Sequence, residues 1–188
     1  MKQLRLDLEY EERVKLSDEI CNKVLNLSIL NKADIIACYI AKPEEVQTEK
    51  LILKLLDMGK KVVIPKVNPE NKGIEFHYLK SFHSELEKGY HGIMEPKTLL
   101  KKLGVKSHID FAIVPSLALD ITGTRIGFGG GYFDRFFSPT PERTTICGIA
   151  FDFQILDTLP SDPHDINVDL IVTEKRTINC SLKHKSIN

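Results

Sequence analysis

The run Asp34-Ile-Ile-Ala-Cys-Tyr-Ile40 is continuous, apolar and of strand length, which is the pattern of a β-strand covered on both faces. Residues 48–58 then show helical periodicity, and Gly59 is well placed to end that helix. A second short apolar run, Lys61-Val-Val-Ile-Pro65, follows directly. Strand, helix and strand at this spacing predict a βαβ unit whose crossover is right-handed.

Similar patterns recur along the rest of the chain. Further strands are expected over 74–79, 111–114, 146–151 and 168–172, and a turn over 120–123. Helices are expected over 2–26, with a second start at Ser17, near 97–103, and from Tyr132 to Phe137. Residues 1–188 therefore predict a single α/β domain, with a three-layer α/β/α architecture and an open, mostly parallel sheet.

Composition limits the class of protein. The 188 residues carry 26 Lys and Arg against 26 Asp and Glu, so the formal net charge is zero. A balanced charge argues against a general nucleic-acid binder, and no apolar run is long enough for a membrane span. The four cysteines are scattered without metal-ligand spacing, which is typical of buried thiols in a reducing compartment. We expect a cytoplasmic monomer with neither nucleic-acid nor membrane partners.

Residues suited to phosphate chemistry are concentrated in Arg125-Ile-Gly-Phe-Gly-Gly-Gly-Tyr-Phe-Asp-Arg135. Four glycines within five positions let a ligand approach the backbone, and a helix starting at Tyr132 would add free N–H groups for an anion. Arg125 and Arg135 can donate charge-assisted hydrogen bonds to phosphate oxygens, and Asp134 is an oxygen ligand suited to Mg²⁺. The spacing matches neither a Walker A loop nor the usual dinucleotide fingerprint. These residues favour phosphate binding, with a tight strand-to-helix connection as the alternative.

Five segments, in order along the chain, carry a family pattern. They are Leu4-Arg5 with Arg13 and Leu16-Ser17 behind it, Glu45-Val-Gln-Thr48, Gly92-Ile-Met-Glu-Pro96, the run from Val114-Pro-Ser-Leu-Ala-Leu-Asp120 to Arg135, and a closing segment with Gln154, Pro160, Asp165 and Val172-Thr-Glu174. Together they resemble the 5-formyltetrahydrofolate cyclo-ligases, also called methenyltetrahydrofolate synthetases, over nearly the whole chain. Each piece alone is common, but five in this order are specific.

The resemblance implies an ATP- and Mg²⁺-dependent enzyme whose substrates are ATP and 5-formyltetrahydrofolate. ATP would phosphorylate the formyl oxygen, N10 would close the ring on the activated carbon, and phosphate would leave, giving 5,10-methenyltetrahydrofolate and ADP. Such chemistry requires alignment and charge neutralisation and needs no side-chain nucleophile. Two other readings stay open: a sugar-phosphate isomerase-like phosphoester enzyme, and a non-catalytic binder of folate or nucleotide.

The resemblance also implies a role for each matching residue. ATP would be bound by Lys2, Arg5, Arg125, Ile126, Gly127, Phe128, Gly129, Gly130, Gly131, Tyr132, Phe133 and Arg135. Folate would be bound by Ile40, Glu45, Met94, Phe128, Gly129, Gly130, Gly131 and Tyr132. Asp134 and Asp165 would hold Mg²⁺, and Arg125, Tyr132 and Asp134 are the expected catalytic residues.

Three positions depart from the family pattern. Lys2 lies three residues before Arg5, where the family has its lysine four residues before the arginine. At this spacing Lys2 still shares a helix face with Arg5. Phe133 replaces a frequent tyrosine, and Met94 replaces a proline.

Several of these residues have a plainer reading on residue type alone. Asp165 is suited to a turn, and Glu45 precedes a helix whose dipole it would complement. Arg13 reads as a solvated helix residue. Only the resemblance favours functional roles for Asp165 and Glu45.

Overall fold

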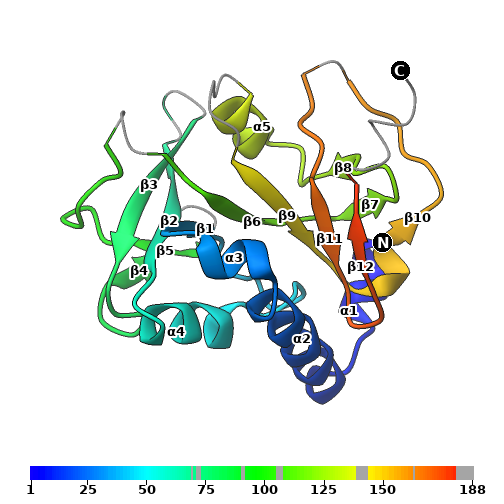
Figure 1. Cartoon of the computed structure of the whole chain (residues 1–188), viewed down its shortest axis with the longest axis horizontal. Coiled ribbons are helices and arrows are strands. Elements are labelled where there is room, and N and C mark those ends of the chain that lie inside the picture. The colour runs from blue at the N-terminus through cyan, green and yellow to red at the C-terminus, as the bar shows by residue number, and fades with distance from the viewer. Residues whose placement is uncertain are drawn as a thin grey trace.

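Within the part of the chain that the structure describes, seven strands form the main sheet (Figure 1). This computed structural model describes residues 1–68, 70, 73–89, 92–104, 108–138, 144–162 and 164–180. The strands are β1 (Ile35–Cys38), β2 (Lys61–Asn68), β3 (Gly73–Leu79), β6 (Phe111–Pro115), β9 (Thr145–Ile149), β11 (Leu170–Val172) and β12 (Thr177–Asn179). Their order is β12-β11-β9-β6-β1-β2-β3. The central strands pair in parallel, whereas β3 and β12 pair antiparallel at the two edges, so the predicted mostly parallel sheet is confirmed.

Helices cover both faces of this sheet. They are α1 (Lys2–Leu6), α2 (Tyr10–Leu25), α3 (Ser28–Lys32), α4 (Glu49–Asp57) and α5 (Tyr132–Phe137). Figure 1 shows α2, α3 and α4 along one face and α5 on the other. Alternate residues of β6 divide the core, since Phe111 and Ile113 pack on the side of α2 to α4, whereas Ala112 and Val114 pack with Phe137 of α5. The predicted three layers are present, and the second helical layer is reduced to one short helix.

Two small sheets complete the fold. One contains β7 (Ala118–Asp120), β8 (Arg125–Ile126) and β10 (Ile155–Leu156), and the other contains β4 (Leu86–Lys88) and β5 (Met94–Pro96). The turn between β7 and β8 falls where it was predicted, and Asp120 Oδ1 accepts hydrogen bonds there from the N–H groups of Thr122 (2.8 Å) and Thr124 (3.1 Å). Burial opposes ionisation of Asp120, but the hydrogen bonds outweigh it and lower the pKa of this carboxyl. The hairpin delivers Arg125 to the start of the glycine-rich segment.

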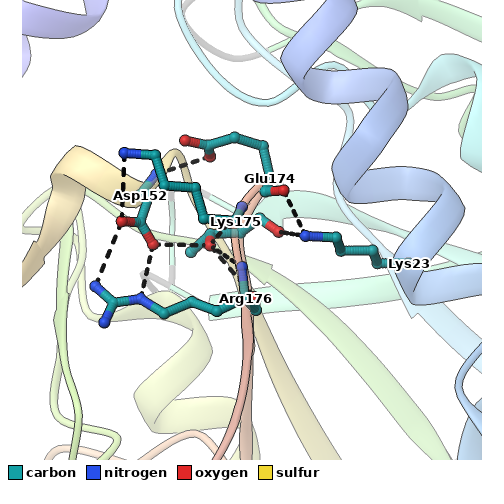
Figure 2. A network of polar contacts seen from close by, with 6 residues as sticks. Lys23, Asp152, Glu174, Lys175 and Arg176 are labelled. Atoms are coloured by element: carbon teal, nitrogen blue, oxygen red, sulfur yellow. Dashed lines mark hydrogen bonds and ion pairs between the residues drawn. The ribbon is translucent and has the colours of Figure 1, made fainter.

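A network of polar contacts fixes the β11–β12 end of the sheet (Figure 2). Asp152, in the 3₁₀ turn η2 (Asp152–Gln154), accepts hydrogen bonds at Oδ1 from Thr173 Oγ1 (2.9 Å) and Arg176 Nε (2.8 Å). Lys23 Nζ of α2 donates to the backbone carbonyls of Thr173 and Glu174. Burial raises the pKa of Asp152, but the bonds from Thr173 and Arg176 outweigh burial and lower it overall. The network therefore ties α2, η2 and the β11–β12 hairpin together.

The predicted helix over 2–26 is wrong in detail. The helix is interrupted at residues 7–9, so that α1 and α2 are separate helices. Ser17 does not start a helix, because it is buried inside α2 and its Oγ donates to the Arg13 carbonyl at 2.7 Å. The short helix α3 and the edge strand β12 were not predicted.

The helix predicted near 97–103 is also wrong. In this described segment, the Leu103 N–H donates to the Phe76 carbonyl (2.7 Å), and the Lys101 carbonyl accepts the Tyr78 N–H (2.9 Å). The segment is therefore paired beside β3, because its backbone groups satisfy the open edge of the sheet.

The cysteines are all buried, and none forms a disulfide within the described residues, as expected. Burial raises the pKa of Cys21 to about 12, so this thiol stays protonated. Among the helices of the described residues, none combines the length and apolarity that crossing a membrane requires.

Candidate active site

The candidate site lies where parallel strands of the main sheet end. Ligands of open α/β sheets bind at this carboxyl edge. Arg125 Nη1 donates to the Pro115 carbonyl at the end of β6 (3.4 Å), and the ring of Phe128 lies under Lys42, which follows β1. The glycine-rich segment is thus folded over the ends of β1 and β6.

Residues 127–131, here named the glycine loop, take conformations that side chains would obstruct. Gly131 has a φ of +59°, and a Cβ atom at Gly127 would lie 2.8 Å from Arg125 Nη1. The loop runs into α5 at Tyr132, as predicted. However, α5 has only six residues, so its dipole is small and arginine side chains supply most of the positive charge here.

Arg125 and Asp134 form a shielded ion pair. Arg125 Nη2 donates to Asp134 Oδ1 at 2.8 Å, and the two side chains are 4% and 20% exposed. Ile166 N–H also approaches Asp134 Oδ1, at 3.4 Å. Among the described residues, both contacts of this carboxylate fall on Oδ1. Arg125 therefore orients Asp134 while leaving Oδ2 for another cation.

Asp165 lies in a turn next to this ion pair. Its Oδ2 accepts a hydrogen bond from the Asp162 N–H (2.9 Å), so the turn role suggested by its residue type is present. The side chain is exposed, and the next residue, Ile166, is the one that contacts Asp134. The turn therefore brings the two predicted metal carboxylates into the same region.

Two carboxylates are enough for Mg²⁺, which is seldom bound by protein ligands alone. The described residues contain no group of three or more His, Cys, Asp or Glu suited to a metal ion. Mg²⁺ usually takes one or two carboxylates together with phosphate oxygens and water. Asp134 and Asp165 suit that arrangement, and their metal role stays a prediction.

Arg5 has the most unusual environment in the site. Its side chain is 1% exposed, and within the described residues its Nε and Nη2 have no hydrogen-bond partner. Glu44 Oε1 lies 3.9 Å from Nη2, beyond hydrogen-bond distance. The guanidinium stands 5.1 Å from the ring centre of Phe128, and Lys42 Nζ stands 4.5 Å from it. Two cations thus meet at the glycine loop, as an anion site requires. Lys2 is exposed on the same short helix.

Glu45 is a buried carboxylate beside these cations. It is 5% exposed, and its Oε2 accepts the Lys42 N–H at 2.9 Å. Burial raises its pKa, although the Lys42 hydrogen bond and the charges of Lys42 and Arg5 oppose the shift. The hydrogen bond of this side chain goes to the backbone of its own loop, and the alternative reading, a partner for the dipole of α4, stays a prediction. Ile40 is half-buried and packs against the core on the side of α2 to α4.

Met94 lies on β5, which packs along β2. Lys66 Nζ donates to the Pro96 carbonyl (2.8 Å), and the Val67 N–H donates to the buried Glu95 (3.3 Å). Met94 itself is 37% exposed. The contacts of Glu95 and Pro96 thus hold this segment near the end of β2, and its predicted contact with folate stays a prediction.

The residues after the glycine loop divide between surface and core. Arg135 stacks on Tyr132 at 5.3 Å, and its Nη2 donates to the Gly130 carbonyl at 2.7 Å. The ring of Phe133 instead stacks on Phe137 at 6.4 Å and joins the core. Phe133 is only partly buried there, and its predicted contact with ATP stays a prediction.

Sequence reasoning missed two residues that support the site. Gln154 is 1% exposed, and its Nε2 donates to the carbonyls of Ser116 (2.9 Å) and Leu117 (3.0 Å), which lead from β6 to β7. Gln154 matches the family pattern in the sequence, but the resemblance implies no function for it. Arg13 was interpreted as solvated, and this is wrong, because its guanidinium bonds three backbone carbonyls.

The fold and the site together define an open α/β protein with a candidate anion site at the carboxyl edge of its sheet. Residues 1–174 match the model of the 5-formyltetrahydrofolate cyclo-ligase family. The chain therefore belongs to this family of enzymes, and the resemblance found in the sequence is confirmed.

Two relatives and two solved structures illustrate the relation. The chain is 28% identical to a probable 5-formyltetrahydrofolate cyclo-ligase of Caenorhabditis elegans, covering 95% of this chain and 91% of the relative. It is 28% identical to the 5-formyltetrahydrofolate cyclo-ligase of Escherichia coli K12, covering 94% and 97%. Its structure resembles the 5,10-methenyltetrahydrofolate synthetase of Aquifex aeolicus, with a TM-score of 0.82, 32% identity and coverage of 95% and 88%. The synthetase of Mycoplasma pneumoniae gives a TM-score of 0.72, 25% identity and coverage of 92% and 93%.

Proposed function

We propose that this chain converts 5-formyltetrahydrofolate into 5,10-methenyltetrahydrofolate, using ATP and Mg²⁺ and releasing ADP and phosphate. Family membership supports the folate conversion. The observation that most supports the use of ATP is the buried guanidinium of Arg5, which faces the glycine loop without a hydrogen-bond partner among the described residues. A phosphate group would supply the acceptors that this cation lacks.

The proposed reaction has two steps. The formyl oxygen attacks the γ-phosphorus of ATP, and the bond from that phosphorus to ADP breaks. N10 then attacks the formyl carbon, loses its proton, and the former formyl oxygen leaves as inorganic phosphate. The protein mainly aligns the two substrates and neutralises phosphate charge.

Phosphate binding falls to the cations around the glycine loop. Arg5 would hold phosphate oxygens through Nε and Nη2, and Arg125 has a buried Nε without a partner in the described residues. Loop residues 126–133, with Lys2 and Arg135, would line the nucleotide. Tyr132 would stand between nucleotide and folate, as the family resemblance implies.

Asp134 and Asp165 are the residues that would hold Mg²⁺. The ion pair with Arg125 uses Oδ1 of Asp134, no residue of the described part of the chain bonds Oδ2, and the turn at Asp165 lies next to the pair. When bound, Mg²⁺ would neutralise charge on the phosphates. Arg125 then fixes the direction of the carboxylate before the metal arrives.

Folate binding would use the loop after β1. Glu45 would accept hydrogen bonds from N–H groups of the pterin ring, and Ile40, Met94 and the glycine loop would line the same pocket. The position of Glu45 beside Lys42 and Arg5 supports this assignment, because a folate bound at Glu45 would then lie next to a phosphate bound by these cations. We further propose that residues 1–188 act as one domain, and that the protein is a cytoplasmic monomer, with its buried thiols suiting a reducing compartment.

The direct test mixes purified protein with Mg-ATP and 5-formyltetrahydrofolate and follows the methenyl chromophore together with ADP. We expect equal amounts of both products. Turnover of a sugar phosphate without ATP would instead support the isomerase reading. Binding of both ligands without products would support the non-catalytic reading.

A further inference from the structure

Arg13 connects the two segments that carry the proposed ATP and folate residues. It lies on α2, outside the glycine loop. Its Nη2 donates to the carbonyls of Arg5 (3.3 Å) and Leu8 (2.5 Å), and its Nη1 donates to the carbonyl of Pro43 (3.0 Å). One planar guanidinium therefore bonds the end of α1 and the loop after β1 at the same time.

A second link joins the same segments. Ser17 Oγ donates to the Arg13 carbonyl and accepts the Gln47 N–H at 3.0 Å. The Gln47 side chain in turn donates to the carbonyls of Lys42 (2.9 Å) and Glu45 (2.8 Å). The loop of residues 42–47 is thus hydrogen-bonded to α2 near its start, at Pro43, and at its end, at Gln47.

The short helix α1 needs such an external hold. It has five residues, its N-terminus has no side-chain cap, and isolated helices of that length are unstable in water. Its residue Arg5 is buried, and Nε and Nη2 of its side chain have no hydrogen-bond partner in the described residues, so this side chain is held only by the longer contacts with Glu44 (3.9 Å) and the Phe128 ring (5.1 Å). The backbone bonds from Arg13 are therefore well suited to set where the Arg5 guanidinium stands.

We propose that Arg13 is a positioning residue that sets the spacing between the ATP site and the folate site. It touches neither substrate, and it acts on ATP through Arg5 and on folate through Pro43 and the loop that carries Glu45. This inference rests on the proposed function. It adds that the affinities for both substrates depend on one side chain, Arg13, which the sequence alone predicts to lie in solvent.

The first test measures binding and needs no turnover. Arg13→Met keeps the aliphatic stem but removes the donors, and Lys15→Met, at an exposed position of the same helix, is the matched loss of charge. We expect Arg13→Met to weaken the binding of a non-hydrolysable Mg-ATP analogue and of 5-formyltetrahydrofolate each by about 10- to 100-fold in calorimetry, because displacing Arg5 or Glu45 loses a hydrogen bond to a charged group. Lys15→Met should change neither. If Arg13→Met does not fold, Arg13→Lys replaces it, with a smaller loss of both affinities.

The second test separates positioning from general damage to the fold. In an Arg5→Met background, Arg13→Met should cause no further loss of nucleotide affinity, yet it should still weaken folate binding. Equal losses in both backgrounds would overturn the inference, as would unchanged affinities in Arg13→Met. Wild-type protein that binds neither ligand would overturn the proposed function itself, which makes the two failures distinguishable.

Discussion

Arg5 carries a charge where only 1% of the side chain meets solvent, and its Nε and Nη2 lack hydrogen-bond partners among the described residues. A buried charge of this kind destabilises the unliganded protein. The cation–π contact with Phe128 offsets a part of that penalty. A bound phosphate would offset far more of the penalty. Arg5 therefore lowers the stability of the unliganded protein and raises its affinity for phosphate.

Replacing Arg5 by methionine should reveal this exchange. We expect Arg5→Met to keep or raise the melting temperature without ligand, because it removes a buried charge that has no hydrogen-bond partner for Nε and Nη2 in the described residues and only a distant ion pair with Glu44. The same change should weaken Mg-ATP binding by about 10- to 100-fold, the value of hydrogen bonds to a charged group. Thermal unfolding and calorimetry measure the two effects. A lower melting temperature with unchanged nucleotide affinity would show that Arg5 is structural.

Glu45 should make stability depend on pH in the opposite sense to a carboxylate whose pKa folding lowers, such as Asp120. Burial raises its pKa above the ordinary value of 4.5, so the folded protein favours the protonated form. The stability it contributes is present below pH 4.5 and is lost as pH rises through the raised pKa. We therefore expect Glu45→Gln to melt higher than wild type at neutral pH, with the gap closing as pH falls toward 4.5.

The same substitution should weaken folate binding at neutral pH, because an amide oxygen is a poorer acceptor than a carboxylate for pterin N–H groups. Nucleotide affinity should change little. A melting-temperature gap that stays constant with pH would contradict the burial argument. Unchanged folate affinity would contradict the assignment of Glu45 to the pterin ring.

At the scale of elements, the β7–β8 turn depends on a glycine. Gly123 has a φ of +96°, and a Cβ atom there would lie 2.4 Å from the Val168 carbonyl oxygen. Gly59, which follows α4, has a φ of +74° but open space around it. A side chain at Gly123 would be opposed both by the backbone conformation and by a steric clash, whereas a side chain at Gly59 would be opposed only by the backbone conformation.

Alanine substitutions at these glycines form a matched pair. We expect Gly59→Ala to lower the free energy of unfolding by about 1–2 kcal/mol, from backbone strain alone. Gly123→Ala should lower it by about 2–5 kcal/mol, because overpacking against a backbone carbonyl is added to strain. Denaturant unfolding measures both. Equal losses would mean that the turn moves away from Val168 without penalty.

Elements with a strong local pattern were predictable from sequence. The apolar runs of β1 and β6, the periodic α4 and the turn after β7 all lie where expected, because burial on two faces and turn chemistry leave direct traces in the sequence. The helix expected near 97–103 failed for a tertiary reason. Its backbone pairs with β3, and a local pattern does not record that pairing.

At the scale of the whole molecule, the site is assembled from segments distant in sequence. Family resemblance selected Arg5, Glu45 and Asp134 as candidate residues, and the fold brings Arg5 and the loop of Glu45 to the glycine loop. Resemblance did not indicate that Nε and Nη2 of Arg5 lack hydrogen-bond partners among the described residues, or that Arg13 bonds three carbonyls. Those properties arise from contacts across the chain, which no single segment specifies.

The most direct measurement is a crystal structure of the protein with Mg²⁺ and a non-hydrolysable ATP analogue. It should show phosphate oxygens within hydrogen-bond distance of Arg5 Nε and Nη2, the glycine loop against the triphosphate, and one Mg²⁺ bound by Asp134 and Asp165. A nucleotide bound elsewhere, with Arg5 still unpartnered or the two aspartates turned away from the metal, would contradict the account.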